Sequence, residues 1–79
     1  MSWLAQWHWP RLDVLARCEG IDLLALETVP CKDEALALIE LLKRIPEVPA
    51  YLSLACKDAE HLNSGESFKE TVEVRAWRF

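Results

Sequence analysis

The stretch Ile21-Asp22-Leu23-Leu24-Ala25-Leu26-Glu27-Thr28-Val29-Pro30 decides the fold. Its apolar run, residues 21–26, is closed by Glu27, Thr28 and Pro30, which favours a strand buried on both faces. Periodicity alone does not exclude a helix for so short a run. The segment that follows settles the choice, because it is helical and a second short apolar run comes after it.

A helical stripe follows the first strand. The apolar residues of this stripe recur at three- and four-residue steps, which is typical of an amphipathic helix facing a core; they are Cys31, Ala35, Leu38, Ile39 and Leu42. Acidic residues 33 and 34 and basic residues 43 and 44 match the helix dipole, and prolines 46 and 49 end the helix. Residues 50–55 form the second apolar run, so strand, helix and strand make a βαβ unit with parallel strands.

Helices are also expected at both ends of the chain. Trp9-Pro10 disfavours a helix before the proline, so the first helix is predicted to begin at Pro10 and to stop at Gly20. Ser67 and Glu70 have the spacing of a capping box, which predicts a last helix from residue 67. Its continuation to residue 79 fits either a helix or a strand, and we favour a helix.

Composition narrows the class of protein. The chain has 79 residues and a formal net charge of -4, with charges of both signs interspersed, so no nucleic-acid footprint is present. No run approaches the length of a membrane span, and the start lacks the pattern of a signal peptide. The three cysteines are too widely spaced for a disulfide framework. We therefore expect a soluble cytoplasmic protein with reduced thiols and no membrane partner.

Candidate site residues stand where the two strands end, because ligands of parallel sheets bind beyond the carboxyl ends of the strands. After the first strand these are Glu27, Thr28 and Pro30, and after the second they lie in 56–61. A carboxylate next to a buried strand is costly to bury without a cation or several hydrogen bonds. Glu27 is therefore the leading candidate, and an ammonium group is its expected ligand. The alternative is that Glu27 points into solvent or caps the next helix.

Other residues have weaker functional signals. His61 fits a general base, but a histidine in a polar loop is more often a turn residue. The cysteines lack the close pairs of a structural zinc site, so small core residues are favoured over metal ligands; they are Cys18, Cys31 and Cys56. Tryptophans 3, 7 and 9 lack the basic neighbours of an interfacial membrane anchor, which favours packing on a neighbouring helix or a poorly ordered start.

The segment from Asp22 to Pro30, followed by Glu34-Ala35, resembles the Asp-Leu-Leu-Ala-x-Glu-Thr-x-Pro stretch of homocysteine S-methyltransferases. Further pieces agree in order and spacing over roughly residues 8–73: Pro10-Arg11-Leu12, Pro49 to Ser53, Cys56-Lys57-Asp58, His61 to Gly65, and Phe68. The chain would then be a single partial homocysteine-binding domain, with a divergent start at 1–9 and a divergent tail at 74–79.

The resemblance implies a fold and an activity. The family fold is a (β/α)₈ TIM barrel, which needs about 250 residues, so this α/β chain would hold two parallel strands with flanking helices in the order α-β-α-β-α. Its activity moves a methyl group from S-methylmethionine, S-adenosylmethionine or a related donor to the thiol of homocysteine, which forms methionine. By the same resemblance Glu27 binds the amino group of homocysteine, and Thr28 is a weaker candidate for substrate contact.

The departures from the family concern zinc. Three cysteine thiolates hold a thiol-activating zinc in the family, in an Asn-Cys strand end and a Gly-Gly-Cys-Cys pair, and neither motif occurs here. No cysteine of this chain falls on a ligand position, so we expect no bound metal, no catalytic residue and no turnover by the chain alone. The alternative function is a non-catalytic fragment that associates with a full-length partner or with another copy through exposed sheet edges.

Overall fold

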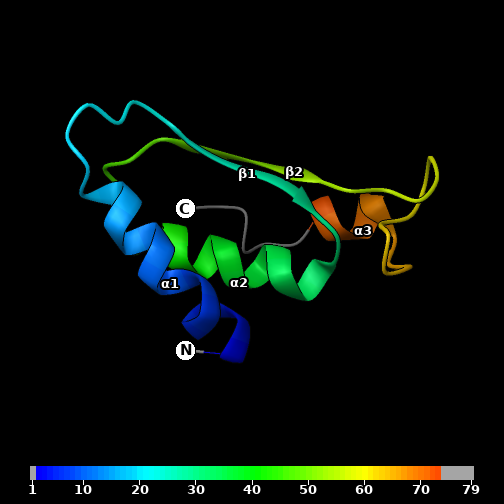
Figure 1. Ribbon diagram of the computed structural model, residues 1–79. Coiled ribbons are helices and arrows are strands. Elements are labelled where there is room, and N and C mark those ends of the chain that lie inside the picture. Colours follow the sequence, from blue (N-terminus) through cyan, green and yellow to red (C-terminus); the bar gives the residue numbers. More distant parts are fainter. Residues whose placement is uncertain (1, 74–79) are drawn as a thin grey trace.

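The chain forms a two-stranded parallel sheet with three helices, as a computed structural model describes for residues 2–73. In chain order the elements are α1 (Trp3–Ala16), β1 (Leu24–Val29), α2 (Lys32–Leu42), β2 (Ala50–Leu54) and α3 (Phe68–Val72). The predicted α/β class and the order α-β-α-β-α are confirmed. Figure 1 shows β1 and β2 side by side, with α1 and α2 on the same side of the sheet.

The core lies between the sheet and this pair of helices. Helix α2 provides more of it than any other element, because its apolar stripe faces both the strands and α1, and Leu41 is fully buried. Leu24 and Val29 contribute from β1, and Ala5 and Leu12 from α1. The other face of the sheet is exposed: Ala25, Tyr51 and Ser53 lie on it.

The prediction that β1 is buried on both faces is therefore wrong for residues 2–73 of this chain. The predicted span of residues 21–26 is also wrong, because the strand runs from Leu24 to Val29. Glu27 and Thr28 consequently lie inside the strand, not after it. The apolar run begins before the strand does: residues 21–23 have no regular secondary structure, and pairing with β2 begins only at Leu24.

Helix α1 begins seven residues before the predicted start at Pro10, because the structure places its first residue at Trp3. Ser2 caps it, and its Oγ accepts the backbone N–H of Ala5 at 3.2 Å. Burial of Ala5 and Leu12 against the core holds the helix across Pro10. The helix ends at Ala16, and Gly20 takes its left-handed conformation (φ 84°) in the turn beyond.

The three N-terminal tryptophans have different surroundings on α1. Trp9 packs against the core, with the Arg44 guanidinium carbon 5.9 Å from the centre of its ring. Trp3 and Trp7 are 73% and 54% exposed, and Arg11 stacks 4.2 Å from the centre of the Trp7 ring. Packing on a neighbouring element therefore holds for Trp9 only.

The polar segment after β2 is an ordered loop that ends at α3. Ser67 caps α3 through its Oγ, which accepts the backbone N–H of Glu70 at 3.2 Å, as the capping box predicts. Within the loop, Asp58 accepts the backbone N–H of His61 at 2.9 Å and also contacts the His61 ring. The predicted continuation of the last helix falls on residues 74–79, outside the described part of the chain.

Replacing Pro10 tests the extent of α1. An interior proline costs a helix about 3 kcal/mol, while its restriction of the unfolded chain returns about 1 kcal/mol. We expect Pro10→Ala to raise the free energy of unfolding by about 2 kcal/mol, measured by urea unfolding with far-ultraviolet circular dichroism. A loss of stability would instead place Pro10 at the first turn of the helix, where proline is favourable.

Candidate functional site

A bulge interrupts the pairing of β1 with β2 at the candidate residues. Leu26 pairs with Leu52, and Val29 pairs with Leu54, so Glu27 and Thr28 together face the single residue Ser53. Such an extra residue kinks a strand and redirects its side chains, and bulges are frequent beside binding sites.

The backbone of the bulge is unusual at Thr28. Its φ of 63° lies in the left-handed region, where a β-branched residue is an outlier. The Thr28 N–H donates to Ser53 Oγ at 2.9 Å, so a side chain of β2 replaces the ladder partner at this point. Strain of this kind persists only where the surroundings hold it.

The bulge also sets which way the site residues face. Before it, side chains alternate between the helix-covered face, with Leu24, and the open face, with Ala25. Val29 is again buried on the helix side, 4% exposed, although strict alternation from Leu24 would put it on the open face. The extra residue thus keeps Val29 in the core and leaves the Glu27 side chain exposed.

Tyr51 contacts the candidate carboxylate from the neighbouring strand. Tyr51 is paired with Ala25, which puts it diagonally across from Glu27 on the open face. Its hydroxyl donates a hydrogen bond to Glu27 Oε1. This bond, then burial and the negative charge of Glu27, raise the pKa of the Tyr51 phenol above its ordinary value. Tyr51 and Ser53 were not predicted as site residues.

The loop after β2 folds over the carboxyl end of the sheet. The Ala55 N–H donates to the Val29 carbonyl at 2.8 Å, and the Ser64 N–H donates to the Pro30 carbonyl at 3.1 Å. Glu66 Oε1 accepts the backbone N–H of Lys32 at 2.8 Å, which lowers the pKa of its carboxyl group together with the Ser64 hydroxyl. The loop is therefore tied to the start of α2, next to the end of β1 that carries Thr28.

A cleft of about 270 Å³ runs between α1 and the edge of β1. Glu27 and Thr28 line it from the strand, and His8 and Glu34 line it from the two helices. His8 Nε2 lies 2.9 Å from Glu34 Oε1, so these two polar side chains hold each other across the helix pair. Arg11, which stacks on the Trp7 ring, also lines the cleft, and the Glu27 side chain is exposed to solvent beside it.

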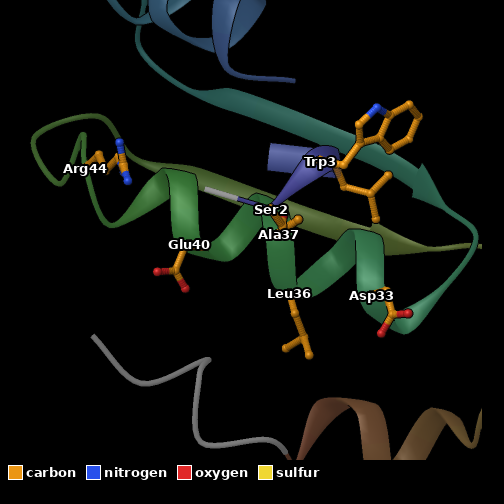
Figure 2. Close-up of a pocket in the computed structure, with 8 residues that line it drawn as sticks. Ser2, Trp3, Asp33, Leu36, Ala37, Glu40 and Arg44 are labelled. Carbon is orange, nitrogen blue, oxygen red and sulfur yellow. The ribbon is translucent and has the colours of Figure 1, made fainter. Parts of the chain in front are cut away.

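A larger hollow, about 760 Å³, lies on the outer side of the helices. Trp3 lines it from α1, and α2 contributes Leu36 and Glu40, which point away from the strands (Figure 2). Neither Glu27 nor Thr28 lines this hollow, so it is not the candidate site.

Residues 2–73 contain neither a cluster of metal ligands nor a membrane-spanning helix. In this range no three histidine, cysteine, aspartate or glutamate side chains gather so that they could hold a metal ion. The three free cysteines follow α1, precede α2 and follow β2, and they are not part of such a cluster. No helix in the described range is long and apolar enough to cross a bilayer.

Comparison with known proteins decides the family. The family model for homocysteine S-methyltransferase matches residues 1–78. The chain belongs to the homocysteine S-methyltransferase family. It is 42% identical over 76 residues to a betaine-homocysteine S-methyltransferase of Drosophila melanogaster. The aligned residues cover 95% of this chain and 22% of that protein. No solved structure matches the chain significantly.

Two bacterial homocysteine S-methyltransferases are also similar to this family member. Homocysteine S-methyltransferase YbgG of Bacillus subtilis is 44% identical over 62 residues, 78% of this chain and 19% of that protein. The homocysteine S-methyltransferase of Escherichia coli is 41% identical over 69 residues, 87% of this chain and 22% of that protein. The chain thus spans about a fifth of the length of these relatives.

Removing the Glu27 charge should lower the pKa of Tyr51. Tyr51 is the one tyrosine in the sequence, so its ionisation can be followed directly by ultraviolet absorbance. We expect Glu27→Gln to move the midpoint down toward the ordinary value of 10.0, because the carboxylate that opposes the phenolate is gone. Glu47→Gln, in the loop before β2, is the control and should leave the midpoint unchanged.

The same shift predicts how stability depends on pH. The pKa of Tyr51 is raised in the folded state. Protonated Tyr51 therefore contributes fully to the free energy of unfolding below its unfolded-state pKa, near 10. This contribution is lost as the pH rises through its folded-state pKa. Glu27→Gln should remove this alkaline loss. Equal midpoints for the wild-type and Glu27→Gln chains would show that the Tyr51 hydroxyl does not contact Glu27.

Proposed function

We propose that this chain supplies the amine-binding strand of a homocysteine S-methyltransferase, with Glu27 as the group that binds the ammonium of homocysteine. The observation that carries the proposal is the position of the Glu27 carboxylate, on the open face of the sheet near the carboxyl end of β1 and beside the bulge. Ligands of parallel sheets bind at that end. Membership of the homocysteine S-methyltransferase family supports homocysteine as the substrate.

The two faces of the sheet support a place in a barrel wall. In a (β/α)₈ barrel, helices cover the outside of the strands and the other face lines the interior. Here α1 and α2 lie on one side (Figure 1), and the face with Tyr51 and Ser53 is exposed. We propose that this exposed face is the barrel interior in a complete domain, so that Glu27 points toward the centre of the barrel near its top.

The electrostatics of Glu27 suit an ammonium ligand. Among residues 2–73 no lysine, arginine or histidine forms an ion pair with this carboxylate. A charge-assisted hydrogen bond between an ammonium and a carboxylate is about twice as strong as a neutral one. Thr28, with its N–H bonded to Ser53, is proposed as the weaker contact, because its backbone fixes the position of Glu27.

Methyl transfer needs more than this strand. The sulfur of homocysteine must lose its proton and attack the methyl carbon of the donor, so that a new S–C bond forms as the bond between that methyl group and the donor breaks. In the family a thiolate-bound zinc activates this sulfur, and residues 2–73 do not form such a site. We propose that the chain binds the amino end of the substrate in the cytoplasm and does not form methionine by itself.

A second candidate is association with another chain. Apolar groups are exposed on the open face and just before β1: Tyr51 is 44% exposed and Leu23 is 52% exposed. Unpaired strand edges readily pair with other chains. A full-length relative or a second copy would cover them, and size-exclusion chromatography with multi-angle scattering would reveal either complex.

Binding of homocysteine to the purified chain tests the proposal. Titration followed by amide NMR is expected to shift signals of residues 27–29 in β1, and Glu27→Gln should weaken binding about tenfold or more, because a hydrogen bond between charged groups is lost. Glu47→Gln should bind like the wild type. The ligand control is 4-mercaptobutyrate, which keeps the thiol and the carboxylate but lacks the ammonium.

Both the binding measurement and the activity measurement have a result that would contradict the proposal. Equal binding of homocysteine and 4-mercaptobutyrate, or undiminished binding by Glu27→Gln, would refute the role of Glu27. The same samples, supplied with S-methylmethionine and zinc, should form no methionine above a protein-free blank. Turnover would show that the chain holds its own catalytic groups.

A further inference from the structure

The Glu27 side chain is long, exposed and attached to a strained bulge. Glutamate is among the side chains that lose most rotamer freedom when they are fixed. A carboxylate that samples several rotamers binds an ammonium weakly, because binding must then order it. A substrate-binding Glu27 therefore requires a partner that holds it without neutralising it.

Tyr51 meets both requirements. Its ring is stiff, with two torsions, and its strand is bonded to β1 on both sides of the bulge, through Leu26 with Leu52 and Val29 with Leu54. Its hydroxyl donates to Oε1 of Glu27 and brings no charge. The negative charge of Glu27 is thus kept for a cationic ligand, whereas a lysine or arginine at position 51 would neutralise it.

The next open-face residue of β2 holds the other half of the bulge. Ser53 Oγ accepts the N–H of Thr28 at 2.9 Å, two residues along the strand from Tyr51. The two polar side chains of β2 on this face therefore each hold one residue of the bulge, one by its backbone and the other by its carboxylate. Strand β2 therefore fixes both the main chain of the bulge, at Thr28, and the side chain of Glu27.

We propose that Tyr51 is a positioning residue for Glu27: its hydroxyl holds Oε1 so that Oε2 is presented to the ammonium group of an amino-acid substrate. This inference rests on the proposed function of Glu27 and extends it to the residue that orients the carboxylate. The raised pKa of Tyr51 agrees with a hydroxyl that stays protonated beside an ionised carboxylate.

The test compares Tyr51→Phe, which keeps the ring and removes the hydroxyl, with the wild type and Glu27→Gln. We expect Tyr51→Phe to weaken homocysteine binding by about threefold to tenfold, as for loss of one hydrogen bond to a charged group, with weak binding of 4-mercaptobutyrate unchanged. A purely structural role would weaken both ligands equally. Circular dichroism of the three chains should be the same.

The second measurement needs no ligand. Scalar couplings of the Glu27 side chain should show one dominant rotamer in the wild type and averaging in Tyr51→Phe. Unchanged couplings would overturn the inference even if no binding were detected. If Tyr51→Phe binds homocysteine like the wild type while Glu27→Gln does not bind, only the role of Tyr51 is overturned. If Glu27→Gln itself binds like the wild type, the proposed function is overturned instead.

Discussion

The hydrogen bond from the Thr28 N–H to Ser53 Oγ, at 2.9 Å, holds the extra residue on which the site depends. It holds a β-branched residue at a φ of 63°, where the chain would not rest without a fixed partner. Because of the bulge, Val29 can lie in the core while Glu27, two residues earlier on the same strand, stays exposed. A regular strand of the same sequence would turn Val29 to the open face.

The layers of the fold follow from this division of faces. Helix α2 covers one face of the sheet because its apolar stripe is continuous, and α1 packs beside it. The open face carries Tyr51 and Ser53, the side chains that hold the bulge. The packed face and the proposed binding face are thus opposite faces of the same two strands, which agrees with the proposed place in a barrel wall.

Much of this architecture could be predicted from the sequence. The stripe from Cys31 to Leu42 and the dipole-matched charges at its ends located α2 to within a residue, since helical periodicity is a local signal. The second strand was located to within one residue by its short apolar run, which is also a local signal. Helix α1 begins earlier than the Trp9-Pro10 pattern predicts, because the Ser2 cap and the burial of residues on both sides of Pro10 outweigh the cost of an interior proline.

The site itself was only partly predictable. Glu27 stood out as a carboxylate beside an apolar run, but its place inside β1 depends on pairing with a strand about 25 residues away, which no local pattern encodes. Tyr51 and Ser53 were missed, although the alternation of polar and apolar residues in 50–54 indicates a strand with one polar-facing side. A bulge changes that alternation in one strand only, so it appears when both strands are seen together.

Nuclear Overhauser contacts of the Tyr51 ring test the central claim most directly, because they report which face of the sheet the ring occupies. We expect contacts from the ring to the side chain of Glu27, across the open face. Contacts from the ring to Ala35 or Leu38 of α2 would contradict this claim, since they would place Tyr51 on the helix-covered face and the bulge out of register.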